Sequence, residues 1–326
     1  MFWRVRAVIV DAGELRWEER PDPDPGDTEI LVAVQAAGIN GADLIQRSGH
    51  YPAPPGAPPD IPGLEMAGEV LSAGRSARRF APGDRVMALV AGGGQATMAA
   101  VDEAHALPVP AGVGWPEAGG FCEAYCTAFD ALFTQCGLTV GERVLVTGAA
   151  GGVGVAGVQL AAAAGARVVA SVRDPARRDG VAALGAHEVV SPDDVPGHGP
   201  YDVVLELVGA ASLPAALGAL ATGGRVSVIG VGSGARLEVD LLALMRSRGR
   251  VGGSTLRARD RREKADVVAA VGARALPLLA AGALRVPVCA TFPMAEATAA
   301  YERFAAGGKL GKVALVTGEP AGQASR

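Results

Sequence analysis

The stretch that most constrains the fold is VLVTGAAGGVG, which runs from Val144 to Gly154 near the middle of a 326-residue chain. A short apolar run ending at Thr147 is followed by a glycine-rich turn and then by VAGVQLAAAAG, a small-residue helical pattern. A turn at a helix N-terminus offers backbone N–H groups to a pyrophosphate when no side chains intervene. The sequence therefore predicts a dinucleotide site here. The contacts that we expect are Ala149, Gly151, Gly152, Val153 and Gly154.

From residue 143 onward, short apolar runs alternate with Ala- and Leu-rich helical patterns. Continuous apolar runs between helices are typical of a parallel sheet that is covered on both faces. The expected strands are Arg143–Thr147, Arg167–Val172, Glu188–Val190, Val203–Glu206, Arg225–Ile229 and Arg250–Ser254. Six such strands make a complete doubly wound domain, which we assign to residues 121–263.

The first 120 residues show a different pattern. Short β-rich pieces alternate with Pro- and Gly-rich turns, including the irregular SGHYPAPPGAPPDIPG, which has the character of a functional loop. The tail ends in the strand-like GKVALVTG, which we expect to return to the first domain. Residues 1–120 and 264–326 are therefore predicted to form one β-rich domain, antiparallel or barrel-like, with the doubly wound domain inserted into it.

Composition excludes several classes of function. The formal charge of −4 gives no net basic field for non-specific binding of nucleic acid. No uninterrupted apolar run approaches the ~20 residues that span a bilayer, so we expect no membrane segment and a cytoplasmic location. The four cysteines lack CxxC pairs, and we expect all of them to be buried or half-buried thiols.

The end of the second strand bears on the choice of dinucleotide. It reaches Val172, where an NAD site would place an acid, and Arg173 and Arg177 follow. Guanidinium groups offer paired donors to a 2′-phosphate, although an exposed polar helix start would have the same sequence. Asp174 either contacts the ribose or caps a helix starting at Pro175, and we favour the cap. We expect NADPH, with Ser171 also among its contacts.

Several motifs occur together along the chain: AAGINGADLIQRSGHY, PGLEMAGEV, PGDRVMAL, EAYCTAFDAL, VLVTGAAGGVGVAGVQLA and GKLGKVAL. In this order they resemble the medium-chain dehydrogenase/reductase superfamily, and within it the zinc-free quinone oxidoreductase branch. The resemblance covers nearly the whole chain. It implies an α/β fold with a GroES-like β-rich catalytic domain and a doubly wound parallel-sheet (Rossmann) cofactor domain.

The resemblance also bears on zinc. Zinc-dependent alcohol dehydrogenases of that superfamily carry two cysteines and a histidine at positions that correspond here to Asn40, Leu64 and Glu123. None of these is a soft ligand, so we expect no metal. Without a Lewis acid, oxidation of an alcohol loses its usual activator. Hydride delivery to a quinone, or to the β-carbon of an enone or enal, fits better because conjugation spreads the incoming charge onto oxygen.

The catalytic residues implied by the resemblance are Asn40 and Tyr51, which would face the nicotinamide across the domain cleft. An amide and a phenol can donate hydrogen bonds to a developing oxyanion. A phenol with a pKa near ~10 donates its proton poorly at neutral pH. We therefore favour Tyr51 as a wall and hydrogen-bond donor, with solvent supplying the proton. The alternatives are an aromatic packed on the Pro-rich loop for Tyr51 and a turn residue for Asn40.

The family pattern implies further cofactor contacts, which are Thr127, Gly230, Val231, Ser254, Leu256 and Lys312. The chain departs from relatives that favour NADPH at Pro192, where those often have a tyrosine near the adenosine phosphate. Arg173 and Arg177 would then have to contribute more to binding the phosphate.

Three functions remain open from the sequence. The first is an NADPH-dependent, zinc-free reductase of quinones or α,β-unsaturated carbonyls. The second is an enoyl reductase acting on a CoA-linked or carrier-linked acyl chain, and the third is an NADPH-binding sensor or structural protein with little turnover. The resemblance also implies a homodimer formed by the cofactor domains.

Overall fold

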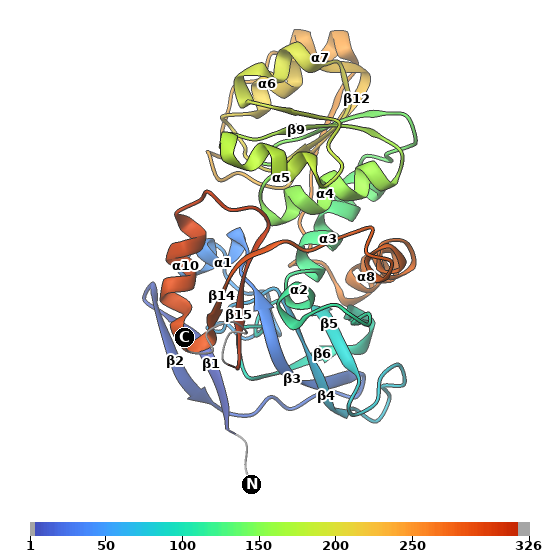
Figure 1. The fold of residues 1–326 in the computed structure, drawn as a ribbon. Coiled ribbons are helices and arrows are strands. Elements are labelled where there is room, and N and C mark those ends of the chain that lie inside the picture. The colour runs from blue at the N-terminus through green and yellow to red at the C-terminus, as the bar shows by residue number, and fades with distance from the viewer. Residues whose placement is uncertain (1–3, 319–326) are drawn as a thin grey trace, which may run out of the picture. The chain divides into compact units, whose positions relative to one another are not determined.

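The computed structural model describes residues 4–318, which form two compact units (Figure 1). Unit 1 comprises the chain up to Glu123, residues 257–307 and the chain from Lys312 onward. Unit 2 comprises residues 124–256 and 308–311. Where the sequence analysis placed boundaries at 120/121 and 263/264, the units meet at 123/124 and 256/257. Each unit has its own sheet.

Unit 1 is built on a seven-stranded mixed sheet of order β14-β15-β3-β4-β5-β7, in which β6 also pairs with β3. Its strands are β3 (Glu29–Gly38), β4 (Glu65–Ala73), β5 (Arg85–Leu89), β6 (Met98–Asp102), β7 (Ala106–Pro108), β14 (Val288–Pro293) and β15 (Lys312–Val316). A separate hairpin joins β1 (Val5–Asp11) to β2 (Glu14–Arg20). The helices are α1 (Gly41–Arg47), α2 (Trp115–Gly119), α8 (Arg261–Arg274), α9 (Leu276–Ala280) and α10 (Ala297–Ala305).

The core of unit 1 follows from side-chain alternation. Along β3, Ile30, Val32 and Val34 are buried while their neighbours are partly exposed, as expected for a strand with one covered face. The last strand, β15, lies between β3, to which it is antiparallel, and β14, to which it is parallel. The C-terminal strand is therefore internal to this sheet.

Unit 2 contains a six-stranded sheet of order β10-β9-β8-β11-β12-β13, and every pairing in it is parallel. The strands are β8 (Arg143–Val146), β9 (Arg167–Ser171), β10 (Glu188–Val190), β11 (Tyr201–Glu206), β12 (Leu220–Val228) and β13 (Arg250–Gly253). The helices are α3 (Cys122–Phe129), which starts in unit 1, α4 (Gly152–Ala163), α5 (Arg178–Ala182), α6 (Leu213–Gly218) and α7 (Leu241–Ser247). In Figure 1, α4 and α5 lie on one side of this sheet and α6 and α7 on the other.

The predicted fold class, a β-rich unit with a doubly wound parallel sheet, is confirmed. All six predicted strands are present with ends that agree within two residues, except that β12 begins five residues early, at Leu220. The sheet reverses its winding between β8 and β11, the point where ligands of such sheets bind beyond the strand ends.

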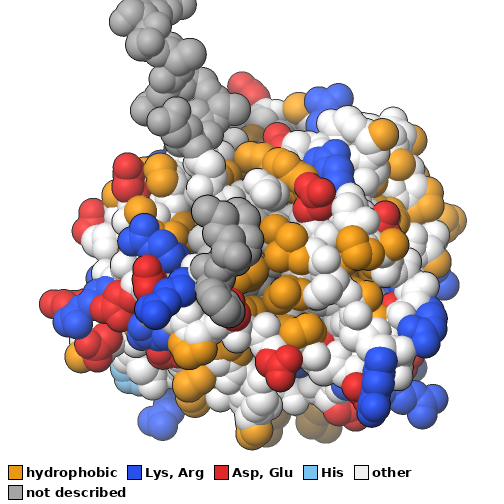
Figure 2. All heavy atoms as spheres, turned by 90° about the horizontal axis from the view of Figure 1, so that it is seen from below, with side chains coloured by type: hydrophobic (Ala, Val, Ile, Leu, Met, Phe, Trp, Pro, Cys, Tyr) orange, Lys and Arg blue, Asp and Glu red, His pale blue; other side chains and the backbone are white. Residues whose placement is uncertain are grey.

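Within residues 4–318, no helix combines the length and apolar character needed to cross a membrane. On the face shown in Figure 2, acidic and basic side chains are interspersed. Three cysteines are buried, but Cys289 is exposed, contrary to expectation, because it is the outward-facing second residue of β14.

Candidate active site

The glycine-rich turn connects β8 to α4. Gly148 has a positive φ of 56°, and α4 begins at Gly152. A Cβ at Gly154 would lie 2.5 Å from the carbonyl oxygen of Gly148, so only glycine fits at this close approach. A Cβ at Gly151 would meet nothing nearer than 3.4 Å, which leaves the helix N-terminus uncrowded. Because the first N–H groups of a helix have no helical partner, this turn suits a pyrophosphate.

The tail of the chain contributes to the same turn. Gly311 donates its N–H to the carbonyl oxygen of Ala150 at 2.8 Å and forms a parallel bridge with Gly151. Leu310 packs against Gly180 of α5, where an added Cβ would lie 2.7 Å from Leu310 Cδ2. Gly311 therefore borders the turn and Leu310 borders α5, although no local pattern in the sequence placed them there.

A buried carboxylate braces the two strand ends beside the turn. Glu206, the last residue of β11, accepts hydrogen bonds through one oxygen, Oε1, from Thr147 Oγ1, the N–H groups of Val208 and Gly209, and Ser212 Oγ. These distances run from 2.6 to 3.0 Å. The end of β11, the loop after it and the end of β8 are thus fixed to one another at the switch point.

The arginine-rich segment follows β9, which ends at the buried Ser171. Asp174 accepts the N–H of Ala176 at 3.0 Å and caps a short 3-10 turn, as predicted. Its other oxygen lies 3.4 Å from Arg177 Nε, so this guanidinium is tethered beside the loop. Arg173 is exposed. Both predicted arginines therefore lie just beyond the carboxyl end of β9.

The remaining predicted cofactor contacts in unit 2 lie on α3 or follow the strand ends. Thr127 on α3 is 7% exposed, and within the described residues its Oγ1 has no hydrogen-bond partner. An orphaned buried hydroxyl suits a ligand group. Ser254 Oγ donates to Asp130 Oδ2 at 2.9 Å. The others are Gly230 and Val231 after β12 and the buried Leu256 after β13.

In unit 1, Asn40 belongs to a buried polar cluster. Its side-chain Nδ2 donates to Glu65 Oε1 at 3.0 Å, and its Oδ1 accepts from Lys312 Nζ at 2.6 Å. Lys312 Nζ also lies 2.5 Å from Glu65 Oε1. Asp43 accepts the N–H groups of Asn40 and Gly63, and burial raises its pKa to about 6. Asn40 is thus held by a buried ion pair, and the ammonium of Lys312 is committed to that pair.

The second predicted catalytic residue, Tyr51, is fixed by Arg257. The Arg257 guanidinium lies 4.9 Å from the centre of the Tyr51 ring, and Nη1 donates to the Tyr51 carbonyl oxygen at 2.9 Å. Its other donors reach Gln46 Oε1 and the carbonyl oxygen of Ala91. Burial raises the pKa of Tyr51, and the charge of Glu123 raises it further, while the charge of Arg257 lowers it. The sequence offered no basic neighbour for Tyr51, since Arg257 is 206 residues away.

Glu123 joins the same group of residues. Its backbone N–H donates to Glu65 Oε2 at 2.8 Å, and its side chain is partly exposed. Burial first, and then the charge of Glu65, raise the pKa of Glu123 to about 8, while Lys312 and Arg257 lower it. Unit 1 therefore brings Asn40, Tyr51 and an acid with a strongly shifted pKa together.

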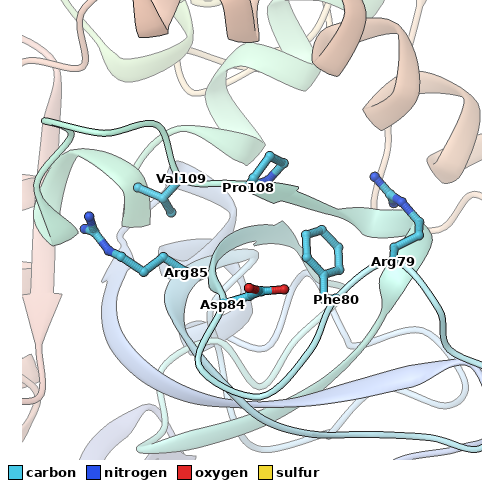
Figure 3. Close-up of a pocket in the computed structure, with 6 residues that line it drawn as sticks. All are labelled: Arg79, Phe80, Asp84, Arg85, Pro108 and Val109. Carbon is cyan, nitrogen blue, oxygen red and sulfur yellow. The ribbon is translucent and has the colours of Figure 1, made fainter.

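A separate hollow of about 460 Å³ in unit 1 does not contain these groups (Figure 3). Its lining residues are Arg79, Phe80, Asp84, Arg85, Pro108 and Val109. The Arg85 guanidinium lies over the Trp115 ring at 4.1 Å and donates to the carbonyl oxygen of Val113. Because its cations have partners and Asp84 offsets their charge, this hollow lacks the convergent reactive groups of an active site.

Comparison with known proteins identifies the family. Residues 26–134 match the family model for the alcohol dehydrogenase GroES-like domain, and residues 152–271 match that for zinc-binding dehydrogenase. Quinone oxidoreductase from Homo sapiens is 30% identical over 90% of this chain and 91% of its own length. The chain belongs to the medium-chain dehydrogenase/reductase superfamily. It is an oxidoreductase of the quinone oxidoreductase-like branch, as predicted from the motifs.

Two further comparisons are with a much larger protein and with a solved structure of similar length. The spectinabilin polyketide synthase system protein NorB from Streptomyces orinoci is 34% identical over 88% of the chain, which spans only 13% of NorB. The structure of mycobacterial Rv1454c complexed with NADPH superposes with a TM-score of 0.85 at 26% identity, covering 96% of this chain and 99% of that one.

The three residues expected from the resemblance at zinc-ligand positions all lie in unit 1. Asn40 is tied to Lys312 and Glu65, Leu64 is 1% exposed, and Glu123 adjoins the cluster. Among residues 4–318, no group of three or more His, Cys, Asp and Glu side chains is arranged to hold a metal ion.

Proposed function

We propose that this medium-chain reductase is a zinc-independent, NADPH-dependent oxidoreductase that reduces a quinone or an α,β-unsaturated carbonyl compound. The observation that carries this proposal is the cluster in unit 1. At the positions where the resemblance implies zinc ligands, the cluster has Asn40, Leu64 and Glu123. The amide of Asn40 accepts a hydrogen bond from the ammonium of Lys312, and Tyr51 lies nearby. Such groups assist through hydrogen bonds and protons, which is enough for a conjugated acceptor.

NADPH is the cofactor, and its fit rests on unit 2. The open N-terminus of α4 suits the pyrophosphate, and the orphaned Thr127 hydroxyl suits a polar group of the nicotinamide end. Arg173 and Arg177 follow β9, where a 2′-phosphate would lie, and Asp174 is occupied as a cap. The NADPH complex of the similar Rv1454c supports the same assignment. When bound, the cofactor supplies the hydride.

Tyr51 is proposed to hold the acceptor oxygen. Its raised pKa keeps the phenol protonated, so it can donate a hydrogen bond to an oxygen that gains negative charge. Asn40 is the weaker candidate for this contact because its Oδ1 and one Nδ2 hydrogen are already engaged. Arg257 holds the loop that carries Tyr51.

A homodimer through unit 2 is also proposed. The edge strand β13 is exposed along its whole length, and α7 exposes Leu241, Leu242 and Met245 at 68%, 54% and 72%. A free strand edge beside large apolar side chains is a surface that a second copy can cover.

The alternative acceptor is an enoyl thioester on CoA or a carrier protein, and the similarity to NorB, a polyketide synthase system protein, favours it. The test is NADPH oxidation with quinones, enals, enones and enoyl thioesters in parallel, with NADH as the control donor and metal content measured on the same sample. Turnover of quinones or enones without zinc supports the proposal. Turnover of thioesters alone supports the alternative, and activity that requires tightly held zinc contradicts both.

A further inference from the structure

The carboxyl group of Glu123 lies beside the buried cluster of unit 1. Glu123 lies in the first turn of α3, and its backbone N–H is bound to Glu65, whose other oxygen binds Asn40 and Lys312. The start of α3 is thereby fixed to the buried cluster. Unlike Glu65 and Lys312, which are 0% and 3% exposed, the Glu123 side chain reaches solvent in part.

The carboxyl group of Glu123 is also unengaged. Among residues 4–318, its oxygens make no ion pair and no hydrogen bond, whereas Glu65 and Asp43 each have several partners. Glu123 and Thr127 are four residues apart on α3, so their side chains share a helix face. Within the described residues, the buried Thr127 hydroxyl also has no hydrogen-bond partner.

We propose that Glu123 is the acid that donates the proton in the reductive reaction, a role that rests on the proposed function. As the acceptor takes up hydride from the bound cofactor, it gains two electrons and its oxygen becomes negative. The O–H bond of Glu123 then breaks, its electron pair stays on the carboxylate, and the proton forms the new O–H bond of the product. Water on the exposed side returns a proton to the carboxylate.

The charges around Glu123 decide whether the proton is there to donate. The titratable and charged neighbours are Glu65 on β4, Asp43 on α1, Tyr51 in the loop after α1, Lys312 on β15, Lys264 on α8 and Arg257 just before α8. Burial and the two carboxylates outweigh the cations and raise the pKa of Glu123 to about 8. At pH 7 the protonated form of this carboxyl group therefore predominates.

Glu123 is a better proton donor than Tyr51 on these grounds. The pKa of Tyr51 is raised further above its usual range by burial and by Glu123 itself. A general acid works best when its pKa lies near the working pH, which Glu123 satisfies and the phenol does not. Tyr51 can therefore hold the acceptor oxygen while Glu123 protonates it, in place of the bulk solvent that the sequence suggested.

The test compares Glu123→Gln, which keeps the shape but has no acidic proton, with Glu123→Asp, which keeps the acid. The matched control is Glu302→Gln on α10, an exposed carboxyl in the same unit. We expect Glu123→Gln to lower kcat by about 100-fold or more, the usual contribution of a general acid. Its Kd for NADPH, measured by fluorescence titration, should stay within twofold of wild type. Glu123→Asp should retain part of the rate.

Two readouts are specific to the proton. The kcat of wild type should fall tenfold per pH unit above about pH 8, and this limb should be absent in Glu123→Gln. Infrared titration of the protein without substrate or cofactor should show a carboxyl band that disappears near pH 8 and is missing from Glu123→Gln.

Two outcomes overturn the role of Glu123 alone: an active wild type with Glu123→Gln within threefold of it, or a Glu123 carboxyl that is ionised at pH 6. If none of the tested acceptors supports NADPH oxidation by the wild-type protein, the proposed function is overturned, and the proton-donor role with it. The infrared titration reads the protonation of Glu123 in either case.

Discussion

Replacement of Lys312 by methionine should destabilise unit 1 strongly and in a pH-dependent way. The variant keeps the apolar stem of Lys312 but leaves Glu65, which is 0% exposed, without its cation. Removing one partner of a buried ion pair costs about 3–5 kcal/mol. The loss is limited because the orphaned carboxyl can take up a proton. A free glutamic acid has a pKa of about 4.3, so protonating such a group costs about 3.7 kcal/mol at pH 7 and about 1 kcal/mol at pH 5.

The destabilisation should therefore be larger at pH 7 than at pH 5: Lys312→Met should lower the free energy of unfolding by about 3 to 4 kcal/mol at pH 7 and by about 1 kcal/mol at pH 5. Urea unfolding followed by tryptophan fluorescence measures it, since Trp17 and Trp115 lie in unit 1. Adding Glu65→Gln to the variant should restore most of the loss. Arg75→Met, which breaks an ion pair whose side chains are 81% and 53% exposed, is the control and should cost less than about 1 kcal/mol. A loss below 1 kcal/mol for Lys312→Met, or one equal at both pH values, would refute the reasoning.

Three other outcomes are expected. Replacing Arg173 and Arg177 together by alanine should raise the Kd for NADPH at least tenfold, because each phosphate contact is worth roughly 1.5–3 kcal/mol; an equal loss of affinity for NADH would contradict binding of the 2′-phosphate by these two arginines. Tyr51→Phe should lower kcat by up to about tenfold, the value of one hydrogen bond of roughly 0.5–1.5 kcal/mol. A thousandfold loss would instead make Tyr51 the proton donor. Replacing Leu241 and Met245 by aspartate should convert a dimer to monomers in light scattering with the NADPH affinity unchanged; a monomeric wild type rules out the interface.

The parallel sheet could be predicted from the sequence because each strand is a short apolar run between helices. The five-residue error at the start of β12 has a local cause. Gly223 and Gly224 suggest a turn, but the strand runs through them, and its pairing with β11 shifts register between Tyr201 and Val203. Glycine within a strand is typical of such irregularities.

The candidate site could be predicted only in part. Motifs identified Asn40, Tyr51 and the zinc positions, but not what surrounds them. Arg257 reaches Tyr51 across 206 residues, and Lys312 reaches Asn40 across 272. No local pattern carries such contacts, since they join segments that are far apart in the sequence and meet only when unit 1 folds. The one signal for Glu123 was an acid at a family ligand position, and its shifted pKa needed Glu65 beside it.

The position of residues 308–311 has a consequence for how the protein is made. The glycine turn that begins at Gly148 receives its contact from Gly311 about 160 residues later, and β15 between β3 and β14 follows immediately. A ribosome therefore has to translate past Gly311 and β15 before either unit can take its final form. Until then the nascent chain exposes an unpaired edge of β3 and an incomplete turn, so a chain that is cut short before residue 308 should be a substrate for chaperones and proteases rather than a smaller enzyme.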